Sequence, residues 1–107
     1  MSRLFAALLM GVALATWAAA EPEFKLAIEK HAFTPDRIEV PAGKKVKLLV
    51  ENRDATPAEF ESALLKIEKV IPGKGNATIF VGPLTPGEYP FADEYNAKSA
   101  KGVVVAK

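Results

Sequence analysis

Five acidic residues are the side chains of this sequence best able to do chemistry. Glu59 and Glu61 flank Phe60, and side chains alternate along an extended strand, so both carboxylates are expected on one face and the phenyl ring on the other. Carboxylates that are brought together repel one another, and a bound cation relieves that repulsion. Hard oxygen ligands suit Fe(III), Mn(II), Mg(II) or Ca(II), and Cu(II) also accepts them. The five candidate metal ligands are Glu59, Glu61, Glu68, Asp93 and Glu94.

A second interpretation of these acids stays open. Acidic residues on strand faces and in loops are most often solvated, or paired weakly with surface lysines. Four lysines stand near the five acids in the sequence: Lys66, Lys69, Lys98 and Lys101. On this interpretation the acids form a solvated face that holds no metal.

Several kinds of chemistry are excluded by what the chain lacks. It has no cysteine, and both methionines, Met1 and Met10, lie in the first twenty residues. His31 is the only histidine, and we interpret it as a surface residue of the first turn, away from the acids. Catalytic triads need a nucleophile beside a base, and phosphate loops need a glycine-rich turn between strand and helix. Neither pattern is present, so neither a hydrolase triad nor a phosphate-binding loop is expected.

The first twenty residues resemble an export signal. Arg3 precedes an apolar run, LFAALLMGVALA, and three alanines at 18–20 precede Glu21. A membrane anchor is the rival interpretation, but the run is shorter than the ~20 residues that a bilayer requires. We expect a cleaved signal peptide at 1–20 and one domain at 21–107. Loss of Arg3 leaves 13 basic and 13 acidic residues, so neither nucleic-acid binding nor membrane insertion of the mature chain is expected.

The rest of the chain is patterned as short strands. Alternating or β-prone runs occur at 24–30, 46–52, 66–71, 77–81, 88–92 and 102–107, and another follows Phe33. Turns rich in proline and glycine separate these runs. The stretch FESALL at 60–65 fits either a strand end or a helical turn. Strands at this spacing predict an all-β, antiparallel sandwich or Greek-key barrel of about seven to eight strands.

Two long stretches, 33–54 and 82–107, resemble the cupredoxins, and shorter motifs resemble one branch of them. AEFES (58–62), EKVIPG (68–73), GPLTPGEYPF (82–91) and DEY (93–95) are similar to the cupredoxin-like domain of EfeO-type and FtrB-type iron-uptake proteins. The resemblance implies a Greek-key β-sandwich located in the periplasm. It also implies partners, namely a membrane iron permease and other periplasmic iron-uptake components. The implied cofactor is a copper or iron ion, with a ferroxidase-type oxidation of Fe(II) as an open question.

The same resemblance assigns the four blue-copper ligand positions to Glu59, Asp93, Asn96 and Ala100. A blue-copper site needs two imidazoles, a thiolate and a weak axial thioether, and none of them is present here. In the cupredoxin fold the loops that carry the five acids converge at one end. The resemblance therefore implies a hard-cation site built from Glu59, Glu61 and Asp93, with Glu68 and Glu94 beside them.

Two functional hypotheses follow. In the first, the protein belongs to a periplasmic ferrous-iron uptake system and binds iron or copper through the acidic cluster. In the second, it is a metal-free β-sandwich module that lost the copper ligands and uses the same acids to contact a partner protein. Both hypotheses predict a protein without the intense visible colour of a blue-copper centre.

Overall fold

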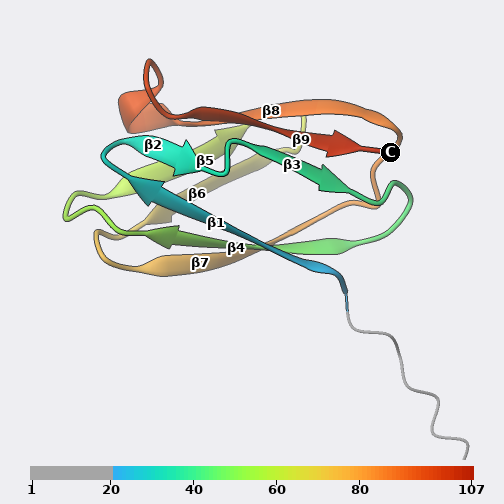
Figure 1. The fold of residues 1–107 in the computed structure, drawn as a ribbon, viewed down its shortest axis with the longest axis horizontal. Helices are drawn as coiled ribbons and strands as arrows, with labels where there is room; N and C mark the ends of the chain where they lie inside the picture. Colours follow the sequence, from blue (N-terminus) through green and yellow to red (C-terminus); the bar gives the residue numbers. More distant parts are fainter. Residues whose placement is uncertain (1–20) are drawn as a thin grey trace, which may run out of the picture.

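The computed structural model describes residues 21–107, and these form nine strands in two sheets that pack face to face (Figure 1). The predicted signal peptide, 1–20, lies outside the described residues. The all-β Greek-key sandwich predicted from the sequence is confirmed, with nine strands in place of the expected seven to eight. The strands are β1 (Glu23–Glu29), β2 (Ala32–Thr34), β3 (Arg37–Val40), β4 (Val46–Asn52), β5 (Ala58–Ser62), β6 (Ile67–Ile71), β7 (Asn76–Val81), β8 (Gly87–Asp93) and β9 (Lys101–Ala106), with a 3-10 turn η1 (Glu94–Asn96) between β8 and β9.

Strand pairing departs from the antiparallel arrangement expected. One sheet has the order β2-β1-β4-β7 and the other β3-β9-β8-β5-β6. β1 pairs with β4 in parallel, and so does β3 with β9, while the other pairs are antiparallel. Period-two alternation identifies a strand but carries no information on the direction of its neighbour, which is why the sequence could not supply these two pairings.

The core fills the space between the sheets. Val46, Leu48 and Val50 of β4 are fully buried and alternate with the less buried Lys47, Leu49 and Glu51. Three phenylalanines join the layers: Phe33 of β2 meets Phe60 of β5 and Phe91 of β8 edge to face, with ring centroids 5.9 and 4.8 Å away. Phe60 and Phe91 are stacked at 4.9 Å. Aromatic pairs in these orientations stabilise a core beyond their buried area alone.

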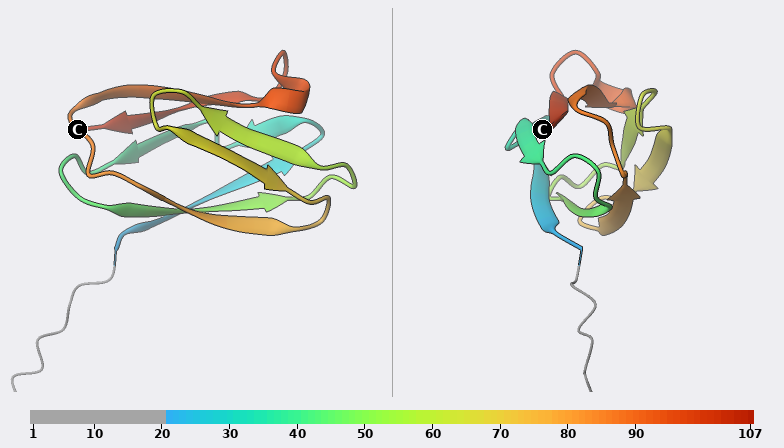
Figure 2. Two further views of the ribbon diagram at one scale, coloured as in Figure 1. Left: turned by 180° about the vertical axis from the view of Figure 1, so that it is seen from behind. Right: turned by 90° about the vertical axis from the view of Figure 1, so that its right-hand side faces the viewer.

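One end of the sandwich, here called the loop end, gathers four connections. The β1–β2 turn, the β4–β5 loop, the β6–β7 turn and η1 lie there, opposite the C-terminus (Figure 1). The parallel register from Glu23 and Lys47 to Ile28 and Asn52 brings the last residues of β1 and β4 to that end. Figure 2 shows the same two layers from behind and from the side. The described part of the chain, 21–107, contains no candidate for a membrane-spanning helix.

Candidate functional site: an acidic face at the loop end

Three of the predicted acids share the outer face of the five-stranded sheet. On β5, Phe60 is buried while Glu59 and Glu61 are half-buried, so the predicted division of this strand into a core face and an acidic face is confirmed. β6 runs antiparallel beside it, and Glu68 stands directly opposite Glu61. Residues directly opposite in adjacent strands point to the same face, so Glu68 extends the acidic surface.

Glu94 is the fourth member of this surface. It is exposed and opens η1, immediately after β8. The pairing of Phe60 with Asp93 places the next residue of that register, Glu94, toward Glu59. We refer to Glu59, Glu61, Glu68 and Glu94 as the acidic face.

The electrostatics of Glu59 reflect these neighbours. Partial desolvation raises the pKa of the Glu59 carboxyl, and the charges of Glu68, Glu94, Glu61 and Asp93 raise it further. Like charges disfavour the ionised form of a carboxyl group. Among residues 21–107, none of the four acidic-face residues forms an ion pair with a lysine, so the lysine pairing that the second interpretation allowed is not seen.

Asp93, the fifth predicted ligand, lies on the opposite side of the sheet. Its side chain is only 1% exposed and shares the inner face with Phe91, two residues earlier on β8. Its Oδ1 accepts hydrogen bonds from the backbone N–H groups of Glu59 (2.9 Å) and Tyr95 (3.1 Å). Its Oδ2 accepts one from the Asn96 side-chain amide (3.2 Å). Asp93 therefore lies beneath the acidic face and is not part of it.

The expected five-acid metal cluster is not assembled in the described part of the chain. Nowhere in residues 21–107 do three or more histidine, cysteine, aspartate or glutamate side chains come close enough to hold one ion. Strand alternation removes Asp93 from the set, because it directs Asp93 inward and the glutamates of β5 and β6 outward. The blue-copper positions do not fit copper either, because Asp93 is already hydrogen-bonded and Ala100 is a fully buried methyl group.

His31 lies at the loop end, which corrects the prediction that it stands away from it. It follows β1 in the two-residue turn to β2, and its carbonyl oxygen accepts a hydrogen bond of 2.7 Å from the Ser99 hydroxyl of the β8–β9 loop. The prediction of a surface residue in this turn is confirmed. Its position follows from the parallel pairing of β1 with β4, which the local pattern did not reveal.

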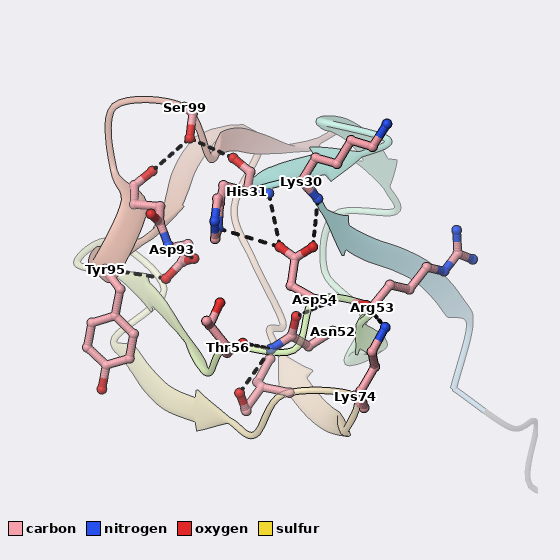
Figure 3. A network of polar contacts seen from close by, with 12 residues as sticks. Lys30, His31, Asn52, Arg53, Asp54, Thr56, Lys74, Asp93, Tyr95 and Ser99 are labelled. Carbon is pink, nitrogen blue, oxygen red and sulfur yellow. Dashed lines mark hydrogen bonds and ion pairs between the residues drawn. The ribbon is translucent and has the colours of Figure 1, made fainter.

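Two polar residues missed by the sequence analysis hold this end together (Figure 3). The Asp54 carboxylate accepts the backbone N–H groups of Lys30 (2.7 Å) and His31 (3.0 Å), and the His31 Nδ1 lies 3.5 Å from it. The hydrogen bond from His31 lowers the pKa of the Asp54 carboxyl, against the opposing effect of partial burial. Asn52 is 1% exposed, and its amide donates to the carbonyl oxygens of Thr56, Ile71 and Pro72.

Exposed apolar side chains border the acidic face. Val70 stands opposite Glu59 and is 49% exposed, and the ring of Tyr95, 53% exposed, points away from the polar network in Figure 3. An open groove of about 500 Å³ continues the surface from Glu61 to Lys101, past Leu64. Apolar side chains rimmed by charge are typical of surfaces that contact other proteins.

Comparison with known proteins identifies the family to which this fold belongs. The model of the cupredoxin-like domain family matches residues 2–106 of the sequence. An uncharacterized protein of Rickettsia prowazekii (strain Madrid E) is 35% identical over 83 residues. The matched stretch covers 78% of this chain and 66% of that relative, so the chain spans just under two thirds of its length.

Solved structures resemble the sandwich at low sequence identity. The metal-binding domain of the Cu(I)-exporting P-type ATPase CopA of Streptococcus pneumoniae D39 has a TM-score of 0.71 at 17% identity, covering 79% of this chain and 84% of that one. Auracyanin A, a blue copper protein of Chloroflexus aurantiacus, has a TM-score of 0.67 at 14% identity, covering 82% and 100%. At these identities the likeness establishes the fold and nothing finer.

Proposed function

The chain belongs to the cupredoxin-like domain family, and from this premise we propose that it is a periplasmic component of a ferrous-iron uptake system that works without a blue-copper centre. The motifs AEFES, EKVIPG, GPLTPGEYPF and DEY support the EfeO/FtrB-type assignment by their resemblance to that branch. The export signal expected at 1–20 supports the periplasmic location.

The function that the geometry supports best is contact with a partner protein through the acidic face. The observation that carries this proposal is the juxtaposition of the four acidic-face glutamates with exposed Val70, which stands opposite Glu59. Exposed Tyr95 follows Glu94 directly in η1. Charge on such a surface steers a basic partner toward it, and buried apolar side chains then contribute affinity. The partner expected in this system is the membrane iron permease or another periplasmic uptake component, with a basic surface facing the sandwich.

Binding to the detergent-solubilised permease tests this proposal. The double variant Glu59→Lys/Glu61→Lys is expected to weaken binding at least about tenfold, mainly through a slower association that depends on salt. Glu88→Lys is the matched control, because Glu88 is an exposed glutamate on β8 far from the loop end. Equal loss of binding by the control, or full retention by the double variant, would refute the acidic face as the contact surface.

A second candidate is the binding of a hard cation, iron or Cu(II), by the same surface. The raised pKa of Glu59 favours it, because a cation would relieve the repulsion among these carboxylates. Carboxylate oxygens stabilise Fe(III) over Fe(II), so bound iron would lose an electron more readily to an external acceptor such as dioxygen. A ferroxidase-type role would follow only from this second candidate.

Calorimetry separates the two candidates. The purified protein is titrated with Fe(III), Mn(II) and Cu(II), and Glu59→Gln/Glu61→Gln is compared with Glu88→Gln. Binding tighter than about millimolar that only the double variant loses would support the cation candidate. The absence of binding to all three ions would eliminate it and leave the protein contact.

A further inference from the structure

A buried carboxylate occupies the position where the cupredoxin resemblance expects the copper-binding cysteine. Residues 21–107 contain three buried polar or charged side chains, those of Asn52, Ser62 and Asp93. An ionised carboxylate loses much of its hydration when it is buried, and the cost is recovered only where hydrogen bonds replace the water. The Asp93 carboxylate at the end of β8 therefore requires strong hydrogen-bond donors close to it.

The three donors to Asp93 come from two segments that pack across the loop end. The N–H of Glu59 belongs to β5, whereas the N–H of Tyr95 and the side-chain amide of Asn96 belong to η1. The carboxylate thus caps η1 and joins it to β5 at the same time. Hydrogen bonds to a charged acceptor are stronger than those between neutral groups.

The backbone closes the same loop from the other side. The N–H of Asp93 donates to the Ala100 carbonyl oxygen (3.0 Å), and the N–H of Ala100 donates to the Asn96 carbonyl oxygen (2.9 Å). Within residues 21–107, no buried side-chain nitrogen or oxygen is left without a partner. Every buried side-chain nitrogen and oxygen of this loop therefore has a hydrogen-bond partner within the protein.

We infer that Asp93 is a positioning residue: it fixes the β8–β9 loop against β5 through hydrogen bonds, so that the loop end is ordered without metal. This inference deepens the proposed function and rests on it. Glu59 and Tyr95 belong to the proposed contact surface, and the backbone N–H group of each donates a hydrogen bond to Asp93. The order of the loop can be tested without any partner, so its failure is distinguishable from failure of the proposed contact.

Amide hydrogen exchange followed by NMR tests the inference directly. In the protein treated with a chelator, the amides of Glu59 and Tyr95 are expected to remain protected, and added Cu(II) or Fe(III) should leave their exchange unchanged. Asp93→Ala should speed exchange at both amides by about tenfold to a hundredfold, the loss expected for hydrogen bonds to a charged acceptor. The control Asp36→Asn, in an exposed turn, should change neither amide.

If Asp93→Ala fails to fold, two further variants, Asp93→Asn and Asp93→Asn/Asn96→Asp, test the same inference. Asp93→Asn retains the acceptor for both backbone amides but opposes its own NH₂ to that of Asn96, so the melting temperature should fall. The double variant Asp93→Asn/Asn96→Asp restores a donor and an acceptor and should recover most of the loss. Slow exchange that appears only after metal is added, wild-type protection in Asp93→Ala, or no recovery in the double variant would each overturn the inference.

Discussion

At the scale of single residues, Asp54 has the clearest effect on stability. It caps a turn in which Lys30 and His31 both have positive φ, 53° and 55°. That conformation costs a residue with a side chain about 1–2 kcal/mol. Asp54→Ala removes the capping bonds, and we expect it to lower the free energy of unfolding by about 1.5–3 kcal/mol in urea. Asp36→Ala, a turn carboxylate elsewhere, should cost much less.

The pH dependence of the Asp54 contribution has a definite sign. The pKa of Asp54 is lowered in the folded protein, so its contribution is fully present above the pKa of the unfolded chain, about 3.9. It is lost as the pH falls through the lower, folded-state pKa. The stability difference between wild type and Asp54→Asn should therefore be constant near neutral pH and shrink below about pH 4. A difference that grows in acid would contradict this assignment.

Glu59 should behave in the opposite way. Its pKa is raised by desolvation and by its acidic neighbours, so its contribution to stability is present below the unfolded-state value, about 4.3, and is lost as the pH rises through the folded-state pKa. Glu59→Gln should raise the melting temperature at pH 7, less so in high salt, and have little effect below about pH 3.5. Melting curves of Glu88→Gln, measured in parallel, should show no such pH-dependent gain.

The sequence predicted the side of the sheet that Glu59 and Glu61 face. It did not predict which of the five acids lie together in space. The spacing of Glu59, Phe60 and Glu61 gave the correct faces. The same alternation applied to Phe91 and Asp93 would have directed Asp93 into the core, and this signal was available in the sequence. The position of His31 depends on the parallel pairing of β1 with β4, a strand distant in the sequence, so no local pattern could supply it.

At the scale of elements, the packing of β8 against β9 depends on the absence of a side chain at Gly102. Gly102 pairs with Phe91, and a Cβ atom added to it would lie 2.3 Å from the Phe91 Cζ and 2.7 Å from the Asp36 carbonyl oxygen. Gly102→Ala should cost about 1–3 kcal/mol in denaturant unfolding, because the ring has to move within a packed core. A double-mutant cycle with Phe91→Leu should recover part of that loss, whereas strict additivity would show that the ring is not the obstacle.

Strand positions were predictable where alternation was clear. The prediction for 46–52 matches β4 in both bounds, since Val46, Leu48 and Val50 face the core in strict alternation. The stretch 60–65 remained ambiguous because β5 ends inside it: the Ser62 hydroxyl accepts the Leu65 N–H and holds a turn. Side-chain hydrogen bonds of this kind compete with strand pairing, and composition alone does not determine which of the two conformations the segment adopts.

At the scale of the whole molecule, two sheets depend on one small core. A domain of this size has a free energy of unfolding of about 5–15 kcal/mol, and its stability comes mainly from buried apolar surface. Phe33 is the aromatic residue of the four-stranded sheet that meets Phe60 and Phe91 of the five-stranded sheet. Loss of one ring from this cluster should therefore weaken the packing between the layers as well as one strand.

Phe60→Ala tests how much of the fold depends on that cluster. Phe60 is fully buried, and truncation of a buried phenylalanine costs about 3–5 kcal/mol, a large share of the total for this domain. We expect a melting temperature lower by ~12 °C or more, measured by circular dichroism. Phe80→Ala is the matched control, because Phe80 is 49% exposed on β7 and contacts lysine side chains, so its melting temperature should fall by only a few degrees. Equal losses in the two variants would show that the aromatic cluster does not hold the sheets together.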